Sequence, residues 1–255
     1  MAQAASLLSL REQIRRIEGV GASMVGGRKG DVRVPLGLPE IDRALPWGGL
    51  PSAGVHELIS GATKADLFDG AAVGFAVFLL SKFAAANRAV LWCRQKNRGF
   101  DRLYGPGLQS LGLPPNRLVV VKAADDKEAL WAMEEGLRSA GVAAVLGEVG
   151  KLDLTASRRL QLASEAGDTA GLLLRPPQKT LAASSVLTRW RIEGVQAGGE
   201  IPTTAWEVEL LRCRYRSAGH AQRWRVEENH ETGAFFVAAD LCHRPVEEGP
   251  IRATG

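Results

Sequence analysis

One stretch of the sequence has two features of a loop that binds the phosphates of a nucleotide. A short apolar strand, residues 55–59, runs into Gly61, and a strongly apolar helix is expected from about Gly70 onward. In a working loop of the form G-x4-G-K-[S/T], backbone amides and the helix N-terminus surround the phosphates, the lysine reaches the β- and γ-phosphates, and the hydroxyl ligates Mg²⁺. Such a site would bind ATP.

The side chains that contact phosphate in such a loop are missing here. Eight residues separate Gly61 from Gly70, and Ala71 and Ala72 follow in place of the lysine and the hydroxyl residue. Lys64 lies inside the loop, but at the wrong offset to replace that lysine. We therefore predict a degenerate phosphate-binding loop and no cofactor.

Two acidic residues of the same loop, Asp66 and Asp69, strengthen this prediction. They bring negative charge to the place where phosphates would lie, and like charges repel, although solvent screening weakens the effect. We predict a pseudo-ATPase, which keeps the fold of an ATPase without its chemistry. The alternative is a DNA-dependent ATPase or recombinase with a noncanonical loop, and nucleotide turnover separates the two.

The composition is that of a globular protein and indicates no other catalytic centre. The chain has 255 residues, 45% hydrophobic, and is long enough for one large core. Its net charge of +4 favours an acidic partner, of which nucleic acid is the commonest. Cys93, Cys213 and Cys242 lack the spacing of zinc ligands, so we expect no metal and reduced thiols. We find no signal peptide or membrane span and expect a cytoplasmic protein.

Strand and helix patterns alternate between Leu36 and Pro177. The expected strands are 54–60, 89–93, 117–121, 143–146 and 171–175, and the expected helices are 39–45, 70–86, 101–111, 126–140 and 155–167. Continuous apolar strands separated by amphipathic helices indicate an α/β fold, with a mostly parallel sheet covered on both faces.

After Pro177 the pattern changes to the period-two alternation of antiparallel strands. The segments 185–193, 205–216 and 222–228 are strand-like, and the last two are expected to form a hairpin. We divide the chain into an N-terminal helix with its linker (1–31), one core domain (32–240) and a flexible tail (241–255).

Apolar residues recur at helical spacing over residues 6–18, which predicts an amphipathic helix. Leu7, Leu10, Ile14 and Ile17 form its apolar stripe, and a Gly-rich linker follows. A helix separated by such a linker has no local partner for that stripe. It docks either on its own domain or on another protein, and the sequence leaves both alternatives open.

Basic residues gather on the strands expected after Pro177. They are Arg189, Arg191, Arg212, Arg214, Arg216, Arg223 and Arg225. Side chains alternate along a strand, so the arginines at 189 and 191 share a face, and those at 212, 214 and 216 share a face. Such rows with nearby aromatic residues suit the phosphates and bases of DNA. In the alternative, glutamates pair with these arginines on a solvated face, and the tryptophans of the same strands belong to the core.

Longer phrases of the sequence resemble known proteins. The run PLGLPEIDRALPWGGLPSAGVHELISG, residues 35–61, resembles the entry to a RecA-type core, and the order of elements over residues 35–230 is similar to that core, including the hairpin. The phrases LPWGGLP, LYGPGLQSLGL, LWAMEEGLRSAGVAAVLGE, LTASRRLQLA, LLLRP and TRWRI are similar to the ImuA family. These are RecA-like proteins of bacterial damage-inducible mutagenesis, so the resemblance implies a RecA-like α/β core.

The RecA-type resemblance also implies where the other catalytic residues would lie. Gln95 aligns near the glutamate that activates the attacking water, but a neutral amide cannot accept a proton. Glu148 is the acid nearest to the Mg²⁺-directing aspartate, and we expect either a weak metal-directing residue or a structural carboxylate. Arg212 and Arg214 align with two lysines that reach the neighbouring subunit's nucleotide, and here they would face an acidic surface on a partner.

The ImuA resemblance implies membership of an error-prone translesion cassette. The expected function is non-catalytic, namely recruiting or bridging during the SOS response at damaged DNA. The expected partners are ImuB, which is Y-family-polymerase-like, and an error-prone replicative-type polymerase. The helix over residues 6–18 resembles one that packs on the adjacent subunit in RecA filaments, so RecA or a second copy is an alternative partner. Two other functions remain open, a modulator of RecA filaments and a SulA-like inhibitor of cell division.

Overall fold

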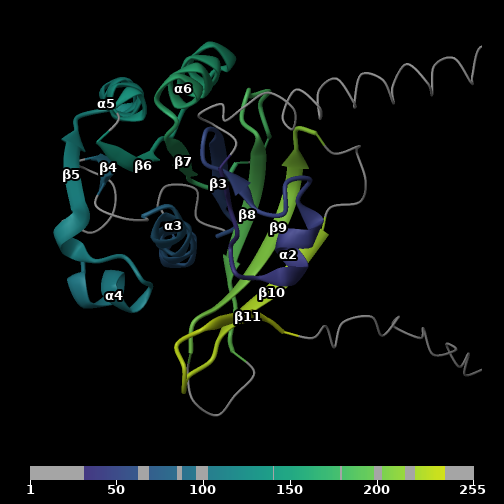
Figure 1. Ribbon diagram of the computed structural model, residues 1–255. Coiled ribbons are helices and arrows are strands. Elements are labelled where there is room, and N and C mark those ends of the chain that lie inside the picture. Colours follow the sequence, from purple (N-terminus) through teal and green to yellow (C-terminus); the bar gives the residue numbers. More distant parts are fainter. Residues whose placement is uncertain are drawn as a thin grey trace, which may run out of the picture.

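Figure 1 shows the computed structural model of the protein, which describes residues 32–62, 69–84, 88–95, 103–139, 141–178, 180–197, 203–215 and 222–238. The predicted N-terminal helix, its linker and the tail lie outside these ranges. The candidate residues that also lie outside them are Leu7, Leu10, Ile14, Ile17, Lys64 and Arg216. Their proposed roles stay predictions.

A nine-stranded sheet forms the centre of the described part of the chain, in the order β11-β10-β9-β8-β3-β7-β6-β4-β5. Six strands run parallel to one another (Figure 1): β3 (Val55–Ser60), β4 (Ala89–Gln95), β5 (Leu118–Ala123), β6 (Val142–Glu148), β7 (Ala170–Arg175) and β8 (Thr188–Gly194). Their apolar sequences suit a parallel sheet whose inner strands are buried on both faces, whereas Val119 and Val120 of the edge strand β5 are exposed. The predicted α/β fold with a mostly parallel sheet is confirmed.

The remaining strands extend the sheet beyond β8 in antiparallel order. They are β9 (Ala205–Cys213), β10 (Gln222–Glu228) and β11 (Phe235–Val237). The predicted pairing of β9 with β10 is confirmed, and the order of elements from β3 to β10 is the one that the RecA-type resemblance implies. The three-residue β11 was not predicted, because so short a strand has no readable alternation.

Helices cover both faces of the parallel part of the sheet (Figure 1). The helical elements are α2 (Pro39–Ala44), α3 (Gly70–Phe83), α4 (Gly105–Ser110), η1 (Pro115–Arg117), α5 (Asp126–Arg138) and α6 (Leu154–Gly167). The α3 helix packs on one face, and α5 and α6 pack on the other. Two short strands, β1 (Arg33–Val34) and β2 (Leu50–Pro51), form a separate pair. No helix among the described residues has the length and apolar character needed to cross a membrane.

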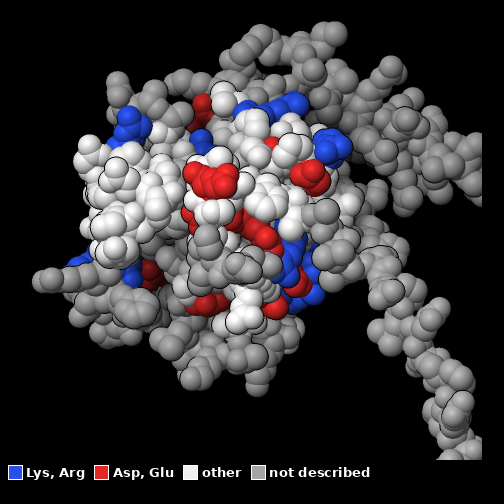
Figure 2. Space-filling view, turned by 90° about the horizontal axis from the view of Figure 1, so that it is seen from below, with Lys and Arg blue, Asp and Glu red and all other residues white. Residues whose placement is uncertain are grey.

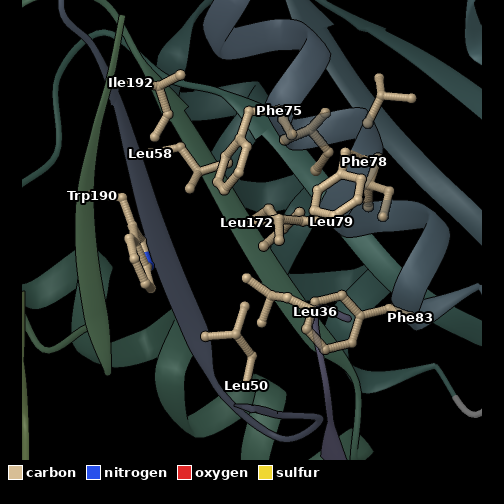
Figure 3. Close-up of a cluster of buried hydrophobic side chains, with 14 of the residues drawn as sticks. Leu36, Leu50, Leu58, Phe75, Phe78, Leu79, Phe83, Leu172, Trp190 and Ile192 are labelled. Atoms are coloured by element: carbon tan, nitrogen blue, oxygen red, sulfur yellow. The ribbon is translucent and has the colours of Figure 1, made fainter. Parts of the chain in front are cut away.

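The larger core lies between α3 and the sheet (Figure 3). Phe75 and Phe78 of α3 pack against the indole of Trp206, with ring centroids 5.5 and 6.0 Å away. Trp190 and Trp206 are each 1% exposed. The alternative that places these strand tryptophans in the core is therefore confirmed for both.

His56, the second residue of β3, is fully buried and has both ring nitrogens satisfied. Its Nε2 lies 3.3 Å from the carbonyl oxygen of Pro51, which only accepts, so Nε2 carries the proton. Its Nδ1 accepts from the hydroxyl of Thr188 at 2.8 Å, and that hydroxyl accepts from Trp190 Nε1 at 2.7 Å. Burial lowers the pKa of His56 to about 4. The histidine is therefore neutral and structural rather than a catalytic base.

The two helices on the other face approach each other closely at their C-terminal ends. A Cβ on Gly167 of α6 would lie 1.9 Å from the carbonyl oxygen of Leu137 in α5, so only glycine fits there. Glu134 of α5 also accepts from Arg138 and from Arg159 of α6. These contacts fix α5 and α6 as one layer.

Candidate functional site: a phosphate-binding position filled by the chain itself

The N-terminus of α3, where a phosphate would bind, is capped by the chain's own carboxylate. Asp69 is the N-cap residue, and its Oδ1 accepts the backbone N–H of Ala71 at 3.1 Å. A bound phosphate would need the same first-turn amides. Ala72, at the position of the Mg²⁺-ligating hydroxyl, is fully buried in the core, so its side chain faces away from any ligand.

A second carboxylate lies at the other end of the same loop. The backbone N–H of Gly61 donates to the carbonyl of Ile192 at 2.7 Å, and the side chain of Glu193 lies directly over Gly61. Ala71 lies next to Gly194, so both ends of the loop meet at the end of β8. Glu193 and the Asp69 cap thus place two acidic groups where a nucleotide would bring further negative charge.

Glu148 is held by an arginine and a tryptophan rather than poised for a metal ion. Its Oε1 accepts from Trp92 Nε1 at 3.1 Å and from Arg94 Nε at 2.9 Å, and the residue is 1% exposed. Burial raises the pKa of Glu148, and the Arg94 hydrogen bond and charge partly offset this rise. Its Oε2 is buried and finds no hydrogen-bond donor in the described part of the chain. An ion pair with Arg94 competes with any cation, which favours the structural alternative for this carboxylate.

The side-chain amide of Gln95 is also committed. It donates to Asp126 at the start of α5 and to the backbone oxygen of Glu148 at 3.3 Å. Asp126 further accepts the backbone N–H groups of Gly150 and Lys151, at 2.7 and 2.9 Å. The Nε2 group of Gln95 therefore ties the ends of β4 and β6 to α5, and both of its hydrogens are used in these contacts. Across the described residues, no three His, Cys, Asp or Glu side chains are grouped to hold a metal ion.

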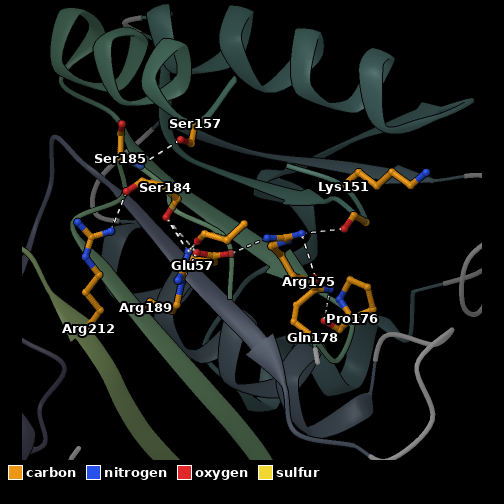
Figure 4. Close-up of polar contacts among 12 residues, drawn as sticks. Glu57, Lys151, Ser157, Arg175, Pro176, Gln178, Ser184, Ser185, Arg189 and Arg212 are labelled. Atoms are coloured by element: carbon orange, nitrogen blue, oxygen red, sulfur yellow. Dashed lines mark hydrogen bonds and ion pairs between the residues drawn. The ribbon is translucent and has the colours of Figure 1, made fainter. Parts of the chain in front are cut away.

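A buried ion cluster lies between β3, β7 and β8 (Figure 4). Glu57, which is fully buried, pairs with Arg175 at 2.8 Å and with Arg189 at 2.6 Å. The cluster contains one carboxylate and two guanidinium groups, so it carries one surplus positive charge. Arg189 is only 5% exposed, which corrects its prediction as a surface residue. The reason is that β8 pairs with β3 on the covered side of the sheet, where Glu57 lies opposite.

The same cluster fixes the connection between β7 and β8. Arg189 donates to the carbonyl of Ala182 and to the hydroxyl of Ser184, each at 2.8 Å. Arg212 of β9 donates to the backbone oxygen of Ser184 at 2.7 Å (Figure 4). Arg212 therefore lies at the outer end of a network that begins at Glu57.

Three other candidate arginines are neutralised by glutamates on neighbouring or the same strands. The ion pairs are Arg191–Glu209 (2.8 Å), Arg223–Glu207, Arg223–Glu209 (3.4 Å) and Arg225–Glu227 (2.5 Å). In the view of Figure 2 acidic and basic side chains likewise lie side by side, and the residues coloured there form no continuous basic surface. Arg191 and Arg223 thus pair with glutamates across strands, the alternative to a DNA-binding row, and Arg225 pairs with a glutamate of its own strand.

A β-bulge sets the direction of Arg212. Arg189 in β8 is opposite Arg212, and Trp190 is opposite Leu210, so Leu211 is an extra residue in β9. Residues opposite each other share a face of the sheet. The bulge therefore turns Arg212 to the side of Arg189 instead of the side of the core.

Arg214 follows the end of β9 and is exposed beside Tyr215, which in turn contacts Trp47. Its guanidinium lies 5.7 Å from the ring centroid of Tyr215, and the ring of Trp47 meets Tyr215 edge-on at 5.7 Å. Tyr215 is 50% exposed. Among the described carboxylates, none forms an ion pair with Arg212 or Arg214.

The sequence reasoning missed Glu57, Arg175 and Tyr215. A signal for the first two was present, because charged residues inside the apolar strands VHELIS and AGLLLR need partners when buried. The contact between Trp47 and Tyr215 joins residues far apart in the chain and has no local signature.

The chain is similar to known bacterial proteins. No family model matches it. The protein ImuA of Caulobacter vibrioides is 34% identical over 226 residues, which cover 83% of this chain and 91% of that protein. The cell division inhibitor SulA of Edwardsiella piscicida is 32% identical over 107 residues, or 42% of this chain and 61% of that protein. The crystal structure of SulA from Pseudomonas aeruginosa is 20% identical, covers 47% of this chain and 96% of its own, and has a TM-score of 0.38. The extent of the match to ImuA shows that the chain belongs to the ImuA family.

Proposed function

We propose that this protein is a non-catalytic accessory component of damage-inducible, error-prone translesion DNA synthesis. It would recruit or bridge ImuB and an error-prone replicative-type polymerase at damaged DNA. Membership of the ImuA family supports the role in the mutagenesis cassette. The partners come from the family resemblance, and the absence of catalysis is argued from the geometry around α3.

The observation that carries the non-catalytic proposal is the capped N-terminus of α3. Asp69 uses the amide of Ala71 that a phosphate would need, and Glu193 adds a second negative charge at the start of the loop. Gln95 and Glu148, at the positions of the water-activating and metal-directing residues, are each engaged in hydrogen bonds. Asp69, Gln95 and Glu148 are thus engaged in hydrogen bonds within the chain, which supports a fold that serves as a scaffold.

The first experiment is a titration of the full chain with ATP and Mg²⁺, alone and with single-stranded DNA. We expect neither nucleotide binding nor phosphate release up to about millimolar ATP, a concentration at the upper end of ordinary enzyme KM values. The matched variant is Asp69→Asn, which removes the charge and keeps an N-cap side chain. DNA-stimulated phosphate release by the unaltered chain would refute the proposal and support the noncanonical ATPase.

The accessory role needs its own test, because loss of ATP chemistry alone does not establish it. We expect the full chain to form a complex with purified ImuB by size-exclusion chromatography. Deletion of the gene should abolish damage-induced mutagenesis, and the Asp69→Asn variant should restore it. Normal mutagenesis in the deletion strain would contradict the role.

A SulA-like inhibitor of cell division is the second candidate, favoured by the 32% identity to SulA over 107 residues. It predicts that the purified chain binds the tubulin-like division protein and that its overproduction makes cells filamentous. A modulator of RecA filaments is compatible with the accessory role. That function predicts altered disassembly of RecA filaments when the full chain is added.

A further inference from the structure

The charges at the end of β9 differ from those along the rest of the antiparallel strands. Arg191, Arg223 and Arg225 each pair with a carboxylate within the sheet. Arg212 and Arg214 form no such pair with the described carboxylates, and the residue opposite Arg212 is itself an arginine, Arg189. Positive charge is therefore concentrated at this end of the strand and cancelled along the rest of it.

The buried cluster beneath adds to this charge. Glu57 neutralises only one of its two partners, Arg175 and Arg189. Arg212 binds the backbone oxygen of Ser184, whose hydroxyl in turn contacts Arg189 at 2.8 Å. The surplus positive charge thus lies directly under Arg212, in a low-dielectric interior where screening by salt is weak.

Aromatic surface lies next to Arg214. Tyr215 is half exposed, the guanidinium of Arg214 lies over its ring, and half-buried Trp47 supports it edge-on. The backbone N–H of Arg214 donates to the carbonyl of Leu187 at 2.8 Å, which fixes the start of this segment against the sheet. Arginines beside an exposed, supported ring match the elements with which proteins bind single strands: cations for phosphates and a flat ring for base stacking.

We propose that Trp47, Arg212, Arg214 and Tyr215, here called the β9-end patch, bind single-stranded DNA. Arg214 contacts a phosphate next to a base that stacks on the exposed surface of Tyr215, and Arg212, two residues earlier in the chain, adds positive charge at the same end of β9. An acidic protein surface would use the two arginines but would gain nothing from the tyrosine ring. The aromatic pair therefore favours a nucleic acid over an acidic peptide. This contact is independent of the accessory role, which is tested through ImuB.

The test is fluorescence anisotropy of the full chain with a labelled oligothymidylate of about 20 nucleotides, longer than the roughly 4–16 nucleotides that one small binding domain covers. Salt is varied from about 50 to 200 mM, the range over which phosphate contacts weaken strongly. The variants are Arg214→Ala and Tyr215→Ala. The matched control is Arg158→Ala, which removes one exposed arginine from α6. Thermal unfolding of all three variants checks that each is folded.

We expect binding by the unaltered chain, with a loss of about five-fold or more for Tyr215→Ala, the effect of removing one stacked base. Arg214→Ala should weaken binding and lower the slope against the logarithm of salt concentration by about 1. Arg158→Ala should bind like the unaltered chain. The proposal is overturned if the unaltered chain does not bind, or if Arg158→Ala weakens binding as much as Arg214→Ala. It is also overturned if Tyr215→Ala binds the DNA as tightly as the unaltered chain. Displacement of the DNA by an acidic peptide at the same concentration of negative charge would overturn it too, and would assign the patch to a protein partner.

Discussion

The buried histidine of β3 makes the stability of the fold depend on pH. Burial lowers the pKa of His56 from 6.5 to about 4 in the folded protein. Between these two values the unfolded chain binds a proton that the folded chain excludes, so stability falls as the pH falls. The stability associated with neutral His56 is fully present above pH 6.5, declines as the pH falls below 6.5, and is fully lost below about pH 4.

The size of this effect follows from the shift. One pKa unit corresponds to about 1.4 kcal/mol, so the full loss is about 3 kcal/mol. At about pH 5 the unfolded histidine is almost fully protonated and the folded one is about one-tenth protonated, which corresponds to a loss of about 2 kcal/mol relative to pH 7.5. That is a large share of the stability of an ordinary domain.

The assay is urea unfolding, followed by tryptophan fluorescence, at about pH 7.5 and pH 5. A measurement on the unaltered chain alone would combine two effects. The raised pKa of Glu148 makes the folded state take up a proton as the pH falls, which increases stability and so opposes the effect of His56. The His56→Gln variant keeps Glu148 and every other carboxylate. The difference between the two pH dependences therefore isolates His56.

We expect the unaltered chain to lose about 2 kcal/mol more than His56→Gln between these pH values. The absolute stability of the variant does not matter, because only its change with pH is compared. Equal losses in the two proteins would refute the reasoning, and would mean that His56 is protonated in the folded state or reached by water.

Three further substitutions test contacts described above by urea or thermal unfolding. Asp69→Ala removes the N-cap of α3 and should cost about 1 kcal/mol, whereas an unchanged stability would mean that the cap contributes nothing. Glu57→Gln leaves two buried arginines without their counter-charge and should cost about 3–5 kcal/mol, against less than about 1 kcal/mol for Glu209→Gln in the more exposed ion pairs. Similar costs at the two glutamates would contradict the burial of the cluster. Gly167→Ala should cost about 1–3 kcal/mol, because the added methyl group meets the carbonyl of Leu137 and the two helices must separate; a neutral result would show that α5 and α6 move apart freely.

Much of the fold could be predicted from the sequence because its elements have local signatures. Continuous apolar strands and amphipathic helices placed the parallel sheet correctly, and period-two alternation placed β9 and β10. Ends were less accurate: α3 ends at Phe83 and not at residue 86, and α4 begins at Gly105 and not at residue 101. Helix ends depend on caps and on neighbouring chain, which periodicity does not report.

The arginines show where local patterns stop being informative. Alternation assigned Arg189 and Arg191 to one face, but it could not report that Glu57, 132 residues away, buries the first of them. The direction of Arg212 depends on a bulge, and a bulge is invisible to a strict two-residue period. By contrast, the missing lysine and hydroxyl of the phosphate loop were readable at once, because that motif is defined by adjacent residues.

The cap on α3 also bears on how readily this chain could acquire a nucleotide site. A lysine at Ala71 would still lie beside the carboxylate of Asp69, and a hydroxyl residue at Ala72 would be placed in the apolar core. Glu193 would have to leave Gly61 as well. No one of these changes would create nucleotide binding alone, and two of them would disturb contacts that stabilise the fold. A nucleotide site at this position would therefore require several changes at once, two of them with a cost in stability, whereas single substitutions on the surface carry no such cost.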